Sequence, residues 1–310
     1  MERHTAGDPI TGLKWTRKTT LKISQELRKA DIDVSPKTVA RLLQELKFSL
    51  RVNHKKLAGN SNPHRNRQFE YIDRMRRRGE RAGWPIISID TKKKEMVGRF
   101  KNAGTTWERE AVPVHDHDFK KDARGTAIPW GLYETGANRG HVFIGTSHDT
   151  PAFAVTALAR WWTRTGQRRY PQANRLLILA DGGGSNGSRN RAWKHQLQTR
   201  FCNRFGLKVT VCHYPPGTSK WNPIEHRLFS QISKNWAGQP LETYETILKF
   251  IRTTKTKTGL TVTATMLDGG YPLGVKTSEA KMAEVHLHSH RVLPMWNYTL
   301  VPASARKPKM

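Results

Sequence analysis

Hydrophobic residues near the N-terminus recur every three or four positions, which is the spacing of one face of a helix. Leu21, Ile23 and Leu27 begin such a pattern, which stops shortly afterwards. Ser35 and Pro36 then favour a second helix, because serine caps helix N-termini and proline suits the first helical position. This second helix is expected to bury an apolar face made of Val39, Leu42, Leu43 and Leu46.

Two short helices joined by a tight turn are typical of a helix-turn-helix, which we assign to residues 1–58. Lys37, Thr38 and Arg41 lie early on the second helix and are candidate DNA-binding residues. An ordinary helical hairpin would show the same spacing. The basic residues that surround the two helices favour the DNA-binding interpretation.

Residues 59–83 form a strongly basic stretch. Glycine, asparagine and proline at 59–63 predict a linker, and Phe69, Ile72 and Met75 predict a helix that ends by Gly83. Such a run of charge is typical of a solvated helix face, and it equally suits a surface that follows a DNA backbone.

After Trp84 the pattern changes to short apolar runs separated by helical segments. Three strands are followed by a helix, a strand, a helix, a strand and a helix. This order predicts an α/β domain over 84–238, a ribonuclease H-like mixed sheet flanked by helices. Residues 239–310 are expected to be a basic C-terminal extension, irregular except for a helix near 243–254. The predicted strands cover 85–90, 128–133, 141–145, 176–180 and 208–212, and the predicted helices cover 150–162, 191–205 and 223–236.

The charge balance indicates what the chain binds. It carries 54 Lys and Arg against 25 Asp and Glu, a formal net charge of +29. Double-stranded DNA is the leading candidate partner, with a ribosomal-type RNA or an anionic membrane as alternatives. No apolar run approaches the roughly 20 residues of a membrane span, and the two cysteines exclude a disulfide framework or a Cys-rich zinc site. The protein is therefore expected in the cytoplasm, associated with the nucleoid.

Asp90 and Asp181 each end an apolar strand. In open α/β sheets ligands bind beyond the carboxyl ends of the strands, so both carboxylates are expected at the ligand-binding edge. Side by side they would repel each other unless a cation lay between them. Aspartate also ends strands without any function, but the same placement on two strands favours a shared site.

Glu225 follows Asn222-Pro223, a good helix start, and so falls in the first helical turn. At about 100° per residue, it lies within the apolar stripe that contains Leu228 and Ile232. A carboxylate that faces a core is costly unless it is paired or bound to a metal. The helix dipole explains a glutamate in the first turn but not its inward orientation.

Three carboxylates gathered in this way would form a site for two Mg²⁺ or Mn²⁺ ions, because hard cations prefer oxygen ligands. Two metal ions close together activate an attacking water or 3′-hydroxyl and stabilise the leaving oxygen at phosphorus. With the excess of basic residues, the pattern predicts phosphodiester chemistry.

Three longer segments carry a family resemblance. Residues 88–95 (SIDTKKKE), 180–189 (ADGGGSNGSR) and 215–229 (PPGTSKWNPIEHRLF) resemble the Rhodopirellula-type transposase DDE domain, the transposase of the ISAzo family of bacterial insertion sequences. The resemblance extends from the helix-turn-helix to Trp296-Asn297-Tyr298. In that family the matching positions are the catalytic acids, so the resemblance implies this role for Asp90, Asp181 and Glu225.

The resemblance implies a DNA transposase that binds terminal inverted repeats, cuts there and joins the freed 3′ ends to target DNA. Asp90 would contact both metal ions, Asp181 one and Glu225 the other. The partners would be double-stranded DNA of the transposon ends and the target, bound by a homo-oligomer. Chains of the family typically begin further upstream, with additional DNA-binding helices, so a truncated N-terminus and a late start of the sequence are both open, and the catalytic core is expected to be whole.

Residues near the three acids are candidates for DNA contact, although lysines beside a strand are often only solvated. Among them, Trp221 would stack on an unpaired base or pack in the core. His213 and His226 are candidates for proton transfer. The glycine-rich segment 182–187 lacks the Gly-Lys-Ser/Thr ending of a P-loop, so no nucleotide site is expected there. The candidate DNA contacts are Lys92, Lys93, Arg189, Lys220 and Trp221.

Two other functions fit the same residues. A non-catalytic DNA-binding protein, such as a repressor, would keep the helix-turn-helix and the basic surface. The short N-terminus favours it, whereas three intact acids speak against it. A ribonuclease H-like nuclease without strand transfer would share the fold and the acids, and only its products would distinguish it.

Overall fold

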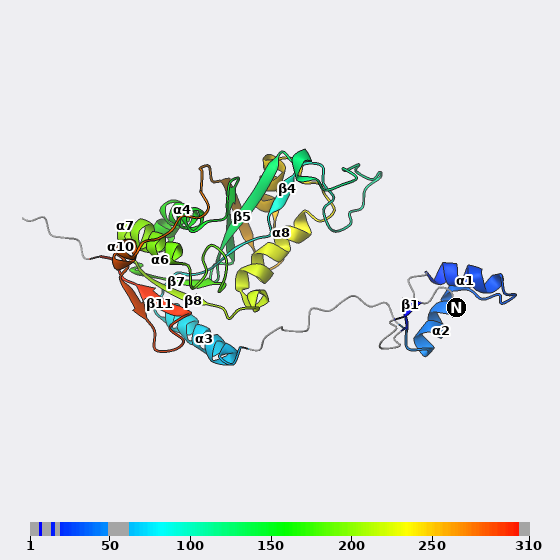
Figure 1. The fold of residues 1–310 in the computed structure, drawn as a ribbon, viewed down its shortest axis with the longest axis horizontal. Helices are drawn as coiled ribbons and strands as arrows, with labels where there is room; N and C mark the ends of the chain where they lie inside the picture. The colour runs from blue at the N-terminus through cyan, green and yellow to red at the C-terminus, as the bar shows by residue number, and fades with distance from the viewer. Residues whose placement is uncertain (1–5, 8–13, 16–18, 49–61, 304–310) are drawn as a thin grey trace, which may run out of the picture. The chain divides into compact units, whose positions relative to one another are not determined.

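The computed structural model describes residues 6–7, 14–15, 19–48 and 62–303 (Figure 1). The chain forms two compact units, Met1–Gly59 and Asn60–Met310. None of the helices in the described ranges has the length and apolarity that crossing a membrane requires.

The first unit contains the two predicted helices, α1 (Thr20–Arg28) and α2 (Pro36–Glu45). Ser35 caps α2, because its Oγ accepts a hydrogen bond from the Thr38 amide at 3.1 Å. The expected N-cap is therefore confirmed. A short antiparallel ladder precedes the helices and pairs β1 (Ala6–Gly7) with β2 (Lys14–Trp15).

The apolar face expected on α2 is only partly covered. Ile23 of α1 and Val39 of α2 are buried where the two helices pack. Leu42 and Leu46, which were expected on the same buried face, are 39% and 63% exposed. Two short helices have too little surface to enclose a complete stripe, so the prediction was wrong for these two leucines.

The second unit is built on one sheet. Its strands are β3 (Ile86–Thr91), β4 (Glu95–Val97), β5 (Gly125–Glu134), β6 (Arg139–Gly145), β7 (Arg175–Ala180), β8 (Lys208–His213), β9 (Thr261–Met266), β10 (Leu287–Ser289) and β11 (Asn297–Leu300). The order is β10-β11-β8-β7-β3-β5-β6-β9, and β4 pairs with β5. β3, β5 and β6 are antiparallel neighbours, whereas β7 and β8 run parallel to β3 on its other side. This mixed arrangement confirms the predicted ribonuclease H-like fold.

Helices cover both faces of the sheet, because successive side chains of a strand point to opposite sides. Their bounds are α3 (Arg65–Arg81), α4 (Pro151–Trp161), α5 (Gln167–Arg169), α6 (Arg191–Leu197), α7 (Asn203–Phe205), α8 (Ser230–Asn235), α9 (Tyr244–Thr253) and α10 (Glu279–Ala283). α4 and α6 pack on the face that carries Ile87 and Ile89. α8 and α9 pack on the opposite face, around Val142 and Ile144.

Three helices contain a π-helical turn. These segments are η3 (Trp162–Gly166) after α4, η4 (Gln198–Cys202) between α6 and α7, and η6 (Glu225–Phe229) before α8. The segments η2 (Lys120–Asp122) and η5 (Ser219–Trp221) are short 3₁₀-helices. π-turns are rare in proteins overall, but those that occur are often found at functional sites.

Strands also form where the sequence indicated irregular structure, in the part of the chain after residue 254. β9 pairs parallel with β6, and β11 pairs antiparallel with β8, so the C-terminal residues extend both edges of the sheet. The helix expected near 243–254 is present as α9. The alternation of Thr with the apolar Val262, Ala264 and Met266 was a visible strand signal, but β10 and β11 are too short to show one.

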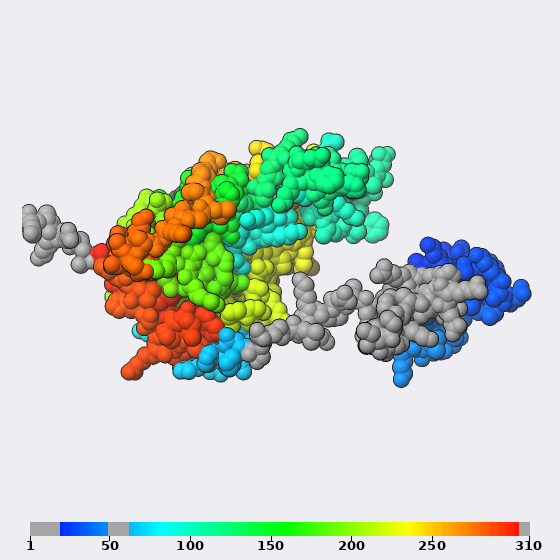
Figure 2. All heavy atoms as spheres, viewed as in Figure 1, coloured from blue at the N-terminus to red at the C-terminus, as the bar shows by residue number. Residues whose placement is uncertain are grey.

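The C-terminal strands are fastened to α3. Gln68 and Asn297, both fully buried, exchange amide hydrogen bonds of 2.8 and 2.7 Å. Tyr71 hydrogen-bonds with Nδ1 of His290 at 2.8 Å. Figure 2 shows the red C-terminal residues lying against the light blue α3. The basic α3 is thus part of the second unit's packing.

A buried charge cluster lies at the end of β5. Glu134, which is fully buried, accepts hydrogen bonds from His141 Nε2 and Tyr170 Oη, both at 2.7 Å, and Arg169 Nε lies 3.3 Å away. Burial raises the pKa of Glu134, but the hydrogen bonds from His141 and Tyr170 outweigh it and leave this pKa below its usual value. The cluster therefore holds an ionised carboxylate inside the fold.

We expect Glu134→Gln to lower the free energy of unfolding by about 3 kcal/mol, because it leaves buried partners without their counter-charge. Chemical denaturation at neutral pH measures this. Glu284→Gln is the control, since it removes an exposed carboxylate 3.3 Å from His195, and its effect should stay below about 0.5 kcal/mol. Equal losses in both variants would contradict the assignment.

Candidate active site

The register of the parallel strands β3 and β7 brings two aspartates together. Ile89 pairs with Ala180, so the next residues, Asp90 and Asp181, occupy neighbouring positions. Adjacent strands lie about 4.8 Å apart. The two carboxyl groups therefore share the carboxyl edge of the sheet, where two negative charges would repel each other unless a positive charge balances them.

Glu225 approaches from the helix that packs on the second face of the sheet, where it opens η6. Gly131 is the sheet partner of Asp90, and a Cβ there would lie 2.5 Å from the ring of Phe229. A Cβ at Gly140 would likewise overlap the Leu228 side chain. Glycine at these two positions lets the helix come close to β5 and β6, and Glu225 thereby lies near enough for its charge to raise the pKa of Asp90.

Two buried polar side chains tie the acid-bearing segments together. Nδ2 of Asn222 donates to Asp181 Oδ1 at 3.1 Å and to the Ile89 carbonyl at 3.3 Å. Ser88 Oγ donates to Asn222 Oδ1 and accepts from the Ile224 amide at 3.1 Å. Sequence reasoning treated Asn222 only as part of a helix start and missed this role. Its place three residues before Glu225 was the available signal.

The crowding of the carboxyl groups shifts their pKa values. Burial, and then the charges of Asp181 and Glu225, raise the pKa of Asp90 from 3.8 to about 8, although the Thr91 amide donates to Asp90 Oδ1 at 2.8 Å. Burial raises the pKa of Asp181 to about 6, opposed by the Asn222 hydrogen bond and aided by Glu225. The three groups cannot all ionise at neutral pH without a cation among them.

The donor set fits hard divalent cations, since all three side chains offer carboxylate oxygens. Across the described residues, however, no three His, Cys, Asp or Glu side chains already stand in the arrangement of a metal-binding group. The three acids therefore lie near one another without forming a closed ligand set.

The glycine-rich segment after Asp181 forms a compact turn. Gly184 has φ +75°, and a Cβ on Gly187 would lie 3.0 Å from the Gly183 carbonyl carbon, so both positions require glycine. The turn leads to Asn190, whose Oδ1 accepts from the Trp193 amide at 3.1 Å and caps α6. Gly183 and Gly184 are exposed and have no side chain. The bare backbone of this turn therefore borders the carboxyl edge of the sheet.

His213 does not open onto the site. It is fully buried, its Nδ1 donates to the Asp181 carbonyl at 2.8 Å, and its Nε2 lies 3.4 Å from Tyr298 Oη. Burial lowers the pKa of His213 to about 4. The imidazole is therefore neutral at physiological pH and holds the main chain of Asp181, a positioning role rather than proton transfer. His226 is exposed on η6.

One of the candidate DNA contacts near the acids is engaged inside the fold. Lys92 is buried, with its Nζ 2.8 Å from Glu95 Oε1 and 4.5 Å from the centre of the Trp236 ring. The sequence placed it beside the first acid but held no signal for these two partners. The remaining candidates, Lys93, Arg189, Lys220 and Trp221, are exposed.

Trp221 is not a core residue. It is 51% exposed, with its ring edge-on to Phe69 at 6.0 Å and Lys220 Nζ 5.6 Å from its centre. The core-packing alternative is thereby wrong. An exposed aromatic ring four residues before Glu225 is placed to stack on a base near the acids.

In the first unit, the candidate contacts lie on α2. Lys37 and Arg41 are exposed, and Arg41 Nη1 is 3.1 Å from Glu45 Oε1. The Thr38 hydroxyl shares a 3.0 Å hydrogen bond with Ser35 Oγ. Lys37 is thus the member of this set whose charge has no carboxylate partner within the described part of the chain.

A family model described as the Rhodopirellula transposase DDE domain matches residues 1–302. Among solved structures, a Mos1 transposase paired-end complex with left transposon end is 16% identical, covers 76% of this chain and 65% of its own, and has a TM-score of 0.44. The corresponding values for the Mos1 mariner paired end complex with Mn are 17%, 76%, 65% and 0.45. This chain therefore spans slightly less than two thirds of the Mos1 chains it matches. No curated protein matches it.

Proposed function

Because the chain belongs to the family of the Rhodopirellula transposase DDE domain, we propose that it is a DNA transposase with Asp90, Asp181 and Glu225 as its catalytic acids. The observation that carries the proposal is that Asp90 and Asp181 end neighbouring parallel strands at the carboxyl edge of the sheet, where burial and neighbouring charges, that of Glu225 among them, raise the pKa values of both aspartates. Such a group is stable in its ionised form only with a cation.

Two Mg²⁺ or Mn²⁺ ions fit this role. Asp90 would contact both, Asp181 one and Glu225 the other. The ions supply activation of a water or 3′-hydroxyl and stabilisation of the leaving oxygen. The protein's own contribution is to hold the three acids in register through β3, β7 and the Ser88–Asn222 contacts. Water would hydrolyse the phosphodiester at the transposon end and free a 3′-hydroxyl, which would then attack a phosphodiester of the target DNA and release the 3′-oxygen of the target strand as a hydroxyl.

The substrate is double-stranded DNA of the transposon ends and of the target, which a net charge of +29 favours. Lys93, Arg189, Lys220 and Trp221 would contact the strand at the acids, because they are exposed in the segments that lead to them. The first unit would bind the terminal inverted repeats through Lys37, Thr38 and Arg41 of α2. Joining two ends requires two active sites, so a homo-oligomer on DNA is part of the proposal.

Cleavage of DNA that carries the element's own ends tests the proposal. The labelled duplex is incubated with the protein and Mn²⁺, and the products are resolved on a denaturing gel. Nicks with a 3′-hydroxyl at the ends, followed by joined products when target DNA is added, are the expected result. Binding to the ends without any cleavage would refute it and favour a DNA-binding protein. Nicks that are never joined would favour a nuclease.

Asn222 is expected to act as a positioning residue. Asn222→Ala removes the donor to Asp181 and leaves Ser88 Oγ without its acceptor, so we expect cleavage to fall by about 10- to 100-fold. The Mn²⁺ concentration for half-maximal rate should rise as well, which a merely structural defect would not cause.

Asn235→Ala is the matched control for this variant. Its amide donates to the Phe250 carbonyl at 2.6 Å, away from the acids. It should leave both the rate and the Mn²⁺ dependence unchanged. If Asn222→Ala keeps the wild-type Mn²⁺ dependence, the positioning role is wrong.

A further inference from the structure

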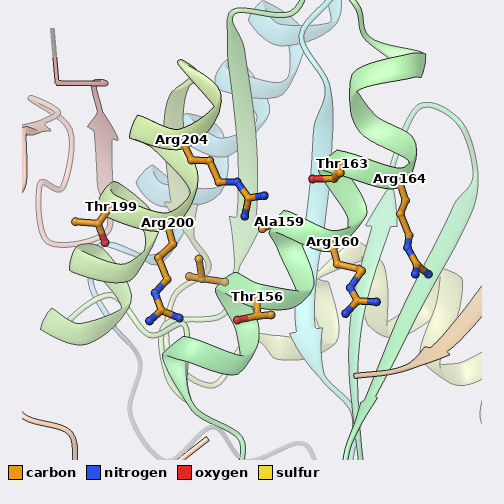
Figure 3. Close-up of a pocket in the computed structure, with 9 residues that line it drawn as sticks. Thr156, Ala159, Arg160, Thr163, Arg164, Thr199, Arg200 and Arg204 are labelled. Carbon is orange, nitrogen blue, oxygen red and sulfur yellow. The ribbon is translucent and has the colours of Figure 1, made fainter. Parts of the chain in front are cut away.

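A pocket of about 730 Å³ lies on the sheet face opposite the Glu225 helix, between two helical walls. α4 with η3 forms one wall, and η4 with α7 forms the other. Figure 3 shows Arg160, Thr163 and Arg164 on the first wall and Arg200 and Arg204 on the second. We call this pocket the arginine groove.

The arginine groove is an uncompensated concentration of positive charge. Within each wall the two arginines are four residues apart, so they lie one turn apart on the same side and repel each other. No acidic side chain lines the groove. Within the described ranges, none of the four guanidinium groups has a carboxylate partner. Four like charges that face one pocket are a cost to the fold that a bound anion would offset.

The hydrogen-bonding groups of the groove are also one-sided. Arginine offers only donors, in a planar fork that matches two phosphate oxygens. The hydroxyl groups of Thr156 and Thr199 already donate to carbonyl groups of their own helices, at 2.7 and 2.9 Å. The free capacity of the groove therefore lies in guanidinium donors, which select a phosphate-like ligand rather than a neutral or cationic one.

The walls are rigid. Trp162 of η3 and Phe201 of η4 are buried and meet at 6.2 Å between ring centres. The π-turns η3 and η4 therefore lie side by side at the base of the groove, and each carries an arginine. Rigid helices hold ligand-binding side chains more accurately than loops do, and rare π-turns on both walls agree with a binding role.

The arginine groove continues towards the candidate active site. A second pocket, of about 640 Å³, shares Arg200 with it and is also lined by Lys94, Gly184 and Asn190, with Asp149 as its one acidic lining residue. Lys94 lies four residues after Asp90, and Gly184 lies three residues after Asp181. From Asn190 to Arg204 the helix rises by roughly 20 Å at about 1.5 Å per residue, which is the axial rise of about six nucleotides. A path of this length fits an extended polyanion better than a single phosphate.

We propose that the arginine groove binds the sugar-phosphate backbone of DNA that continues beyond the candidate active site, independently of base sequence. The proposal rests on the proposed function only in taking DNA as the substrate. Arg160 and Arg200, on opposite walls, hold neighbouring phosphates, and Lys94 leads the backbone to the acids.

The test is the salt dependence of DNA binding by the full chain, measured by fluorescence anisotropy on a short duplex without metal ions. Arg160→Gln/Arg200→Gln should reduce the slope of log affinity against log salt by about 1.8, because each lost phosphate contact accounts for about 0.9. The matched control is Lys255→Gln/Lys257→Gln, which removes two exposed charges after α9 and should leave the slope unchanged. Equal slopes for both double variants would overturn the proposal.

A second measurement locates the DNA even if an arginine variant folds poorly. Thr163→Cys places a thiol at an exposed position of the groove, and the native Cys202 and Cys212 are buried and do not compete for a photo-crosslinker. The labelled protein should crosslink to duplex DNA far more than Lys257→Cys does. Equal crosslinking of the two variants would refute the groove as a DNA path. Crosslinking that inorganic phosphate abolishes but unlabelled duplex DNA does not would refute it as well.

Neither measurement requires cleavage. If the protein fails to cut DNA but shows the expected slope and crosslink, the proposed transposase activity is wrong and the proposed DNA binding by the arginine groove stands. An active transposase with an unchanged slope would lose the groove alone.

Discussion

Asp181→Asn is expected to lower the rate of DNA cleavage on the order of 10³-fold, while the affinity for DNA stays nearly unchanged. The amide keeps the size of the side chain and an oxygen that accepts from Asn222 Nδ2. It removes the charge that a metal ion requires. The loss should therefore fall on the chemical step, which single-turnover cleavage with Mn²⁺ measures, and not on binding, which gel shift measures without metal.

Asp268→Asn is the matched control. This aspartate also follows a strand at the same end of the sheet, since β9 ends at Met266 and runs parallel to β6, but it is exposed at the edge. Its cleavage rate should match the wild type. Parallel losses of cleavage and DNA binding in Asp181→Asn would indicate misfolding and would remove Asp181 from the catalytic set.

In metal-free buffer, Asp90→Asn is expected to raise the stability of the protein at neutral pH. The folded-state pKa of Asp90 is about 8, against 3.8 without the fold. Between these values the unfolded chain releases its proton while the folded protein keeps it, so stability falls by about 1.4 kcal/mol per pH unit. Below that window the group contributes nothing, and above it the loss is complete. At pH 7 the variant should be more stable on the order of 4 kcal/mol.

Thermal unfolding of wild type and Asp90→Asn, at a series of pH values from 4 to 9 with a chelator, measures the difference. The two curves should meet at the acid end and separate as the pH rises. Adding Mn²⁺ should stabilise the wild type and not the variant, which loses a metal ligand. A constant difference across the pH range would show that Asp90 is not held protonated, and Asp268→Asn should show no pH-dependent difference.

These two expectations describe one physical compromise. The acids that chemistry needs are the groups that the metal-free fold tolerates least, because burial and mutual repulsion oppose their charge. Gly131 contributes to this crowding by admitting the Glu225 helix beside Asp90. Under the proposed function such a site would gain stability from bound cations, and metal binding and folding would be coupled.

Much of the catalytic fold follows from local pattern. The apolar runs that end at Asp90 and Asp181 form β3 and β7, and the stripe that includes Leu228 forms the helix that begins with Glu225. Such segments are legible because alternation and helical periodicity record which side of an element is buried. The order of these elements then restricts the sheet to a few topologies, among which the observed one is ribonuclease H-like.

Other features depend on contacts between residues far apart in the chain. The sequence around Lys92 does not predict its contact with the Trp236 ring, and the sequence around Ser88 does not predict its hydrogen bond to Asn222. Both contacts form only when the helix packs on the sheet. The two halves of the arginine groove are about 40 positions apart in the sequence and become one pocket only when α4 and α6 pack together. The strands β10 and β11 are too short to carry a periodic signal and exist because α3 and β8 supply their partners.

The sequence by itself therefore determined the main elements between Ile86 and Asn235, their order and the acids at their ends, since each of these is encoded in the spacing of neighbouring residues. Only the tertiary structure decided how the acids share charge, which lysine is occupied inside the fold and where positive charge remains free. These properties depend on distances and burial across the sheet, and an amino-acid sequence contains them only through the fold that it forms.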